Sequence, residues 1–217
     1  MQAFQFDPIT ITLVLVGLSL APFIVLMVSS FVKIVIILNL IRNALGVQQI
    51  PPNLVLNGIA LMLTIYIMAP VAQETFDLMT KVKLESMDPK VLVQAIDSVK
   101  APIQTFLYRH SNERQRMFFV KTAKRLWPKE QAEALTTKDL MVLIPAFTVS
   151  ELTSAFEIGF LLYLPFVAVD LIVSNILLAM GMMMVSPMTI SLPFKLMLFV
   201  LVNGWSRLLE GIVLTYS

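Results

Sequence analysis

The sequence predicts an all-α protein built from kinked hydrophobic helical hairpins with a small polar insert, part of an oligomeric, membrane-associated assembly. Of its 217 residues, 58% are hydrophobic and 14% are charged, and the mean hydropathy is +0.84. An ordinary soluble domain is about 25% charged. The charges are concentrated in one stretch, and long uncharged runs flank it. About 20 apolar residues span a bilayer as a helix, so these runs predict membrane-length helices.

Four apolar helices are expected from the uncharged runs at 8–32, 53–73, 171–194 and 196–206. With their flanking residues, we place these helices at 10–38, 53–73, 155–180 and 190–214. We expect the first helix to be retained rather than cleaved as a signal sequence. It lacks a basic leading region and a small-residue cleavage site, and its apolar run is too long.

A polar insert separates the second and third apolar helices. Residues 74–139 hold 12 Lys or Arg and nine Asp or Glu, which is 21 of the 30 charges in the chain. Segments 90–98 and 111–126 show helical spacing of apolar residues, with Pro89, Pro102 and Pro128 between or beside them. We therefore predict two or three small helices whose basic residues form a solvated face. The predicted organisation is an N-terminal hairpin over 1–73, the insert over 74–140 and a C-terminal hairpin over 141–217.

The side of the membrane on which each loop lies is judged from Lys and Arg. The short loop between the first two helices carries Arg42 and no acidic residue, which favours the cytoplasm. The insert is also basic, but one crossing separates it from that loop. Long segments cross largely regardless of charge, so the short loop decides and the insert is placed on the opposite side.

Ionisable residues also occur inside the apolar segments. A charge at the centre of a bilayer helix costs about 2.5–3.5 kcal/mol on insertion scales, so such groups pair or face water. Glu151 and Lys195 flank the third and fourth apolar helices at their distal ends. An antiparallel hairpin would not bring them together, and we predict an ion pair between neighbouring copies, which would also fix helix register. The further buried charges expected are Glu157, Asp170 and Lys33.

Prolines are frequent in or beside the apolar helices. Each interior proline removes a backbone hydrogen bond and bends a helix, and the freed groups must be satisfied by other protein or by water. This favours kinked helices packed in an oligomer around a channel. The residues concerned are Pro22, Pro70, Pro145, Pro165, Pro187 and Pro193.

A methionine cluster joins the last two apolar segments. Met180, Met182, Met183 and Met184, with Met188, are five of the 14 methionines. Methionine repacks easily around different neighbours, so a ring of such side chains can close a pore and yield to a passing chain. Gly181 gives the backbone the freedom to form the loop. The alternative is that these methionines fill gaps in a core or face lipid.

Several other functions have little support in the sequence. The chain has no cysteine, one histidine and a net charge of +2, so neither a disulfide framework, a multi-histidine metal site nor nucleic-acid binding is indicated. It has no phosphate-binding GxxxxGK loop and no Ser/His/Asp set, and we predict no enzymatic activity and no cofactor. A proton-coupled transporter using Glu151, Glu157 and Asp170, or a structural scaffold, remains an alternative.

Motifs along almost the whole chain resemble the FliP/SctR family, the export-gate proteins of type III secretion systems. Their details are closer to the injectisome (YscR-like) branch than to the flagellar branch, which stays the alternative. The segments that carry this resemblance are 31–34, 42–51, 143–147, 150–152, 155–160, 164–166, 170–171, 178–184, 186–187, 192–196 and 203–205.

The resemblance implies a core subunit of the gate through which unfolded proteins cross the bacterial inner (plasma) membrane. It implies five copies, assembled with a small two-helix subunit (FliQ/SctS-like) and a third gate subunit (FliR/SctT-like). Much of the assembly, including the insert, then lies on the periplasmic side, and the apolar helices need not cross lipid. The family's gasket corresponds to Met180, Met182, Met183 and Met184, and its ion pair between copies corresponds to Glu151 and Lys195.

Overall fold

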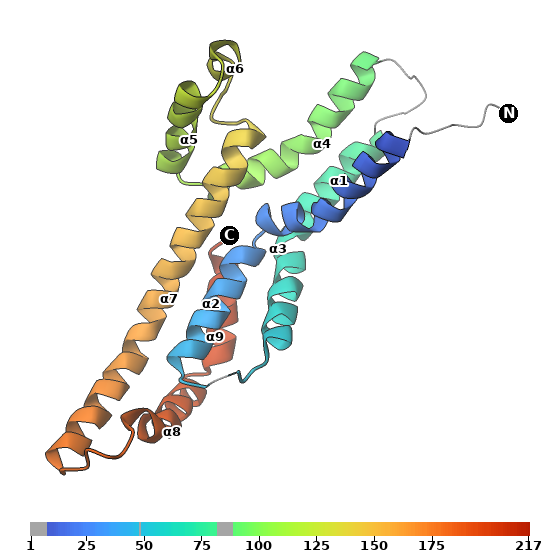
Figure 1. Ribbon diagram of the computed structural model, residues 1–217. Coiled ribbons are helices and arrows are strands. Elements are labelled where there is room, and N and C mark those ends of the chain that lie inside the picture. Colours follow the sequence, from blue (N-terminus) through green and yellow to red (C-terminus); the bar gives the residue numbers. More distant parts are fainter. Residues whose placement is uncertain (1–7, 48, 82–88) are drawn as a thin grey trace.

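The computed structural model describes residues 8–47, 49–81 and 89–217, and over these residues the protein is helical and contains no strand (Figure 1). The all-α prediction is confirmed. In chain order the helices are α1 (Pro8–Met27), α2 (Phe31–Ala44), α3 (Asn53–Lys81), α4 (Pro89–His110), α5 (Glu113–Leu126), α6 (Lys129–Glu133), α7 (Leu140–Ala179), α8 (Pro187–Leu201) and α9 (Gly204–Leu214).

The 40-residue helix α7 forms the long axis of the molecule. At 1.5 Å per residue it is about 60 Å long, roughly twice the thickness of the hydrocarbon core of a bilayer. In Figure 1 the insert helices α5 and α6 lie near its beginning, and the connection to α8 lies at its other end. The sequence predicted a helix only from 155. The helix instead begins at Leu140, with Pro145 inside it and Glu151 paired with Lys33.

The four predicted apolar helices correspond to two long helices and two bent pairs. Among the described residues, α3 and α7 are long and apolar enough to span a membrane, and the total is four if each bent pair counts as one span. The pairs α1–α2 and α8–α9 each bend by 62° at a short break. The second break lies at Val202 and Asn203, and Asn203 adopts the left-handed conformation with φ 52°. The breaks therefore do not coincide with Pro22 or Pro193, which lie inside helices.

The main core surrounds α2. One face of α2 is completely buried, and it packs between α3 and α7 in Figure 1. Most residues of α2 are apolar, and its buried residues recur every three or four positions, which places them on one face of the helix. The buried members of this core include Ile34, Ile37, Leu38 and Ile41 of α2, Leu56 and Ala60 of α3, Ala155 and Phe166 of α7, Phe199 of α8, and Leu208 and Ile212 of α9.

A second core attaches the insert to α7. Phe106 and Leu107 of α4 pack against Leu143 and Phe147 of α7, and Tyr216 near the C-terminus joins them. The helices predicted at 90–98 and 111–126 are confirmed as parts of α4 and α5, and α6 is the third. The structure differs from the sequence prediction at two places. Pro102 does not separate helices but lies inside α4, and α3 does not end at residue 73 but continues to Lys81.

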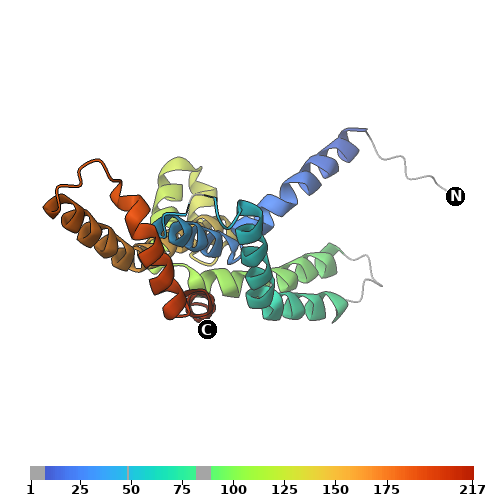
Figure 2. The same cartoon turned by 90° about the horizontal axis from the view of Figure 1, so that it is seen from below.

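Large apolar side chains remain exposed on the helices outside these cores. In Figure 2, α1 extends away from the rest of the molecule. Leu18 on α1, Leu54 on α3, Met141 on α7 and Leu201 on α8 are each at least two-thirds exposed. Monomeric soluble proteins rarely expose contiguous apolar patches of more than a few hundred Å². This surface is suited to contact with lipid or other subunits.

Candidate functional site: the methionine loop and two buried charge clusters

The methionine loop, residues 180–186, has well-defined ends. The N–H of Met182 donates to the carbonyl of Leu177 at 2.9 Å, and that of Gly181 donates to Leu178 at 3.0 Å. This pair of bonds is a Schellman motif, which terminates a helix and requires a left-handed residue. Gly181 has φ +73°, a conformation that residues with a Cβ rarely adopt. Pro187 then occupies the first turn of α8, where proline is favourable.

The methionine side chains extend outward from this loop. Met180 is 59% exposed and Met182 is 44% exposed. Met183 is 81% exposed, and Met184 is fully exposed. They do not fill gaps in the core of this chain. The loop lies at the end of α7 remote from the insert (Figure 1), so the thioethers form an apolar tip on an elongated molecule.

The first charge cluster joins α7, α8 and the end of α2. The Nζ atom of Lys195 donates to Oδ2 of Asp170 at 2.6 Å and to the carbonyl of Ala44 at 3.1 Å. The hydroxyl of Ser191 donates to the other oxygen of Asp170 at 2.5 Å. Lys195 and Ser191 are buried. The Ala44 carbonyl belongs to the last turn of α2, where carbonyls lack helical partners and attract cations.

The second charge cluster joins α2, α7 and the C-terminus. Lys33 Nζ lies 3.6 Å from Oε1 of Glu151, and both side chains are at most 5% exposed. The hydroxyl of Tyr216 donates to the other oxygen of Glu151, and Lys33 also lies 4.6 Å from the centre of the Tyr216 ring. Burial and the Glu151 carboxylate raise the pKa of Tyr216, so its hydroxyl stays protonated and remains a donor.

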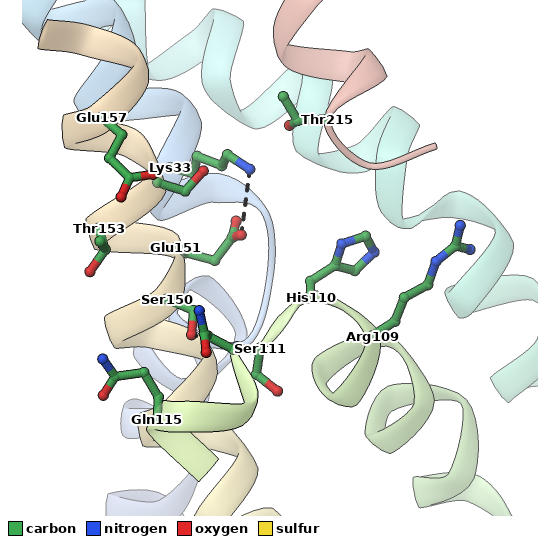
Figure 3. Close-up of a pocket in the computed structure, with 12 residues that line it drawn as sticks. Lys33, Arg109, His110, Ser111, Gln115, Ser150, Glu151, Thr153, Glu157 and Thr215 are labelled. Atoms are coloured by element: carbon green, nitrogen blue, oxygen red, sulfur yellow. Dashed lines mark hydrogen bonds and ion pairs between the residues drawn. The ribbon is translucent and has the colours of Figure 1, made fainter. Parts of the chain in front are cut away.

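A polar cavity of about 330 Å³ opens beside this second cluster (Figure 3). In the close-up, Lys33 and Glu151 face each other from α2 and α7, while His110 and Arg109 approach from α4. Burial, Arg109 and Lys33 lower the pKa of His110 to about 4. Within the described residues, no group of three or more His, Cys, Asp or Glu side chains is arranged to hold a metal ion.

Within one chain, the predicted charges have other partners. Glu151 and Lys195 do not meet within one chain, because Lys33 satisfies Glu151 and Asp170 satisfies Lys195. A pair between copies stays a prediction. Glu157 was expected to be buried, but in this chain it is exposed in the wall of the polar cavity. Asp170 was expected to be buried too, but its side chain is 33% exposed.

Sequence reasoning missed Ser191 and Tyr216. Ser191 stands four residues before Lys195, so the two lie on one face of α8, and this spacing was an available signal. Tyr216 carried no comparable signal, because its position near Glu151 depends on the path of the C-terminal segment.

The fold and these sites define a helical, membrane-associated protein with an exposed methionine tip and a surface suited to association with other chains. Residues 14–212 match the FliP family, and the chain belongs to that family. The family resemblance predicted from the sequence motifs is confirmed.

Several relatives match over almost their full length. Yop proteins translocation protein R of Yersinia pestis is 52% identical over 211 residues, covering 97% of each chain. Hypersensitivity response secretion protein HrcR of Ralstonia nicotianae is 47% identical over 204 residues, covering 93% of this chain and 94% of the relative. Virulence protein YscR of Salmonella typhimurium is 45% identical over 211 residues, covering 97% of this chain and 98% of the relative.

Proposed function

We propose that this chain is a core subunit of the export gate of a type III secretion system, of the injectisome branch, through which unfolded proteins cross the bacterial inner membrane. Membership of the FliP family supports this proposal, as do relatives named for translocation, secretion and virulence. The structural observation that carries the mechanism is the exposed methionine loop at one end of α7.

In this mechanism several copies surround an axis and bring their methionine loops together. The thioethers then form a gasket that closes the opening in a dry contact and keeps ions and small solutes from leaking. An extended chain can displace them, because methionine changes rotamer at little cost. The Schellman motif and Pro187 hold the two ends of each loop while the side chains move. Apolar packing does not select hydrogen-bonding groups, so the seal tolerates many sequences.

The proposed assembly is a pentamer at the inner membrane, with a FliQ/SctS-like and a FliR/SctT-like subunit and with the insert on the periplasmic side. The exposed apolar side chains of α1, α3, α7 and α8 support extensive contacts with other subunits and lipid. A five-membered ring uses head-to-tail interfaces, so different faces of each copy meet. The length of α7 favours an arrangement in which these helices do not simply cross the bilayer.

The ion pair between Glu151 of one copy and Lys195 of the next is part of this proposal. An ammonium has three donors, and Lys195 uses two of them within its own chain. The third donor is available for a neighbour. Both side chains are at most 3% exposed. Assembly must therefore expose the carboxylate of Glu151 and the third donor of Lys195, while Lys195 keeps its two hydrogen bonds within its own chain.

The gasket is tested by replacing Met182, Met183 and Met184 together with alanine in the intact gate complex. We expect the closed complex in a planar bilayer to conduct ions more strongly, while secretion survives at least in part. The control is Met117→Ala, at an exposed methionine of α5 that lies outside the loop and outside the helices assigned to subunit contacts. Conductance that stays at the unmodified level would contradict the gasket and favour a scaffold. Solute uptake into liposomes by this chain alone would favour a transporter.

A further inference from the structure

We propose that Asp170, Ser191 and Lys195 form a latch that sets the position of the methionine loop. The inference rests on the proposed gasket and deepens it. None of the three residues belongs to the loop, so they act as positioning residues. The latch lies within the α7–α8 hairpin, and Asp170 precedes the end of α7 by nine residues, or about 14 Å along the helix.

Two successive turns of α8 hold one carboxylate of α7. Ser191 and Lys195 are four residues apart and share a helix face. The Ser191 hydroxyl contacts Oδ1 of Asp170 at 2.5 Å, and the Lys195 ammonium contacts Oδ2 at 2.6 Å. Because each oxygen has its own donor, the carboxylate fixes both the separation of the helices and their register. Charge-assisted hydrogen bonds of this kind are the stronger ones in proteins.

The same lysine ties the hairpin to the core. Lys195 also donates to the carbonyl of Ala44, the last residue of α2, which is buried in the main core. The chain turns away directly afterwards at Gly46, which has φ +75°. A Cβ at Gly46 would lie 3.9 Å from Lys195 Nζ, so the turn passes close to the ammonium. The latch therefore connects α7 and α8 to a fixed point on α2.

Between the latch and the methionine loop, the hairpin is loosely packed. An apolar groove of about 400 Å³ lies here, lined by Val173, Ile176 and Met180 of the α7 side and by Ile190 and Phe194 of α8. Side chains beside open space lack the contacts that fix a close-packed core. Packing therefore does little to position the loop end of the hairpin, and this task falls to the latch.

Breaking the latch is expected to let α8 and the loop shift, so that the loops of neighbouring copies no longer meet. Asp170→Asn keeps an acceptor for Ser191 but removes the charge beside buried Lys195. A hydrogen bond to a charged group stabilises the closed arrangement strongly. Its loss is therefore expected to raise the population of a minor open state roughly tenfold or more. Ser191→Ala removes one of the two donors and should have a smaller effect in the same direction.

The experiment uses the intact gate complex and exploits the absence of cysteine in this chain. Met183→Cys supplies a single thiol in the loop. The rate of maleimide labelling is compared in the Met183→Cys background, and the ion conductance of the closed complex is compared with all loop methionines in place, each with and without Asp170→Asn or Ser191→Ala. We expect faster labelling and higher conductance, with an unchanged particle mass and recovery in Asp170→Glu. Glu210→Gln, an exposed acid on α9, is the matched control.

The outcomes separate the latch from the gasket. If Asp170→Asn and Ser191→Ala label and conduct like the control while the methionine-to-alanine variant leaks, the latch is wrong and the gasket stands. If the methionine-to-alanine variant does not leak but the latch variants change thiol labelling, the gasket is wrong and the positioning role stands. If Asp170→Asn prevents assembly, the milder Ser191→Ala decides: an intact particle with unchanged labelling overturns the latch.

Discussion

Gly159 of α7 lies directly against the side chain of Leu40 of α2, and a Cβ at Gly159 would collide with it unless Leu40 moved. A Cβ built on Gly159 would stand 2.2 Å from Cδ1 of Leu40 and 3.2 Å from its Cβ. The main core occupies this helix pair, and Gly159 itself is buried. A small residue at a helix crossing lets backbones approach closely, as is common among membrane helices. Gly159 thus sets the distance between α2 and α7.

Replacing Gly159 with alanine is therefore expected to destabilise the protein. Overpacking a close contact costs about 1–3 kcal/mol, because side chains and backbone must shift. The melting temperature of the purified complex should fall. Gly211→Ala in α9 is the matched control, because a Cβ there meets nothing within 4 Å, and alanine favours a helix more than glycine does. Equal melting of the two variants would show that α2 and α7 can separate without penalty.

Removing the hydroxyl of Tyr216 should also lower stability. Tyr216→Phe keeps the ring packed against Phe106 and over Lys33 but deletes the donor to Glu151. A buried acceptor that loses its partner costs about 1–3 kcal/mol, and more if it is charged. Thermal unfolding of the complex measures the effect. Tyr66→Phe, at a 70% exposed position on α3, is the control and should be neutral. A neutral Tyr216→Phe would mean that Lys33 alone satisfies the carboxylate.

The connection between α4 and α5 depends on one arginine. Nη1 of Arg116 donates to the carbonyl of Tyr108 and to the hydroxyl of Ser111, each at 2.9 Å, and the guanidinium lies 4.1 Å from the Tyr108 ring centre. Lysine cannot reproduce this fork and stacking geometry. Arg116→Lys should cost about 1.5–3 kcal/mol locally and speed hydrogen exchange around residues 108–116. Exposed Arg125→Lys is the control, and equal protection in both variants would refute this role.

Which features of this fold were predictable depends on how local their causes are. The polar insert and the apolar helices follow from charge distribution, and the helix stop at Gly181 and start at Pro187 follow from local turn chemistry. The burial of Lys33, Glu151 and Lys195 was predicted from their apolar neighbours in sequence, but the same pattern failed for Glu157, which is exposed. These features require no knowledge of distant contacts.

The partners of these charges could not be predicted in the same way. Glu151 meets Lys33 and Tyr216, which lie 118 and 65 residues away in the chain, and the choice depends on how α2 and the C-terminus dock on α7. The positions of the bends could not be predicted from proline alone. Proline removes one helical hydrogen bond but can remain inside a helix, as Pro165 does in α7. The bend before α9 lies instead at Asn203, which is left-handed, beside the contact of Gly204 with the Phe199 ring.

A charge exchange tests the proposed pair between copies. Lys195→Glu should weaken assembly, because it adds an acid next to Asp170 as well as removing the proposed contact with Glu151 of a neighbour. Adding Glu151→Lys should restore part of the assembled fraction, measured as particle mass, if the pair exists. The control exchange is Lys33→Glu with Glu151→Lys, which reverses the pair within one chain. Rescue in the control exchange alone would show that Glu151 acts only within its own chain.

Acidification should destabilise the protein through His110, the one histidine in the chain. His110 packs against the rings of Phe106 and Tyr216, and burial together with Arg109 and Lys33 lowers its pKa from 6.5 to about 4. Between these two values the unfolded chain binds a proton that the folded chain does not, so stability falls as the pH decreases from 6.5 toward 4. The melting temperature of the complex should drop by a few degrees over this window. His110→Gln cannot titrate and should show a flatter dependence. If both proteins lose stability in parallel, acidic residues elsewhere account for the whole effect and His110 contributes nothing to it.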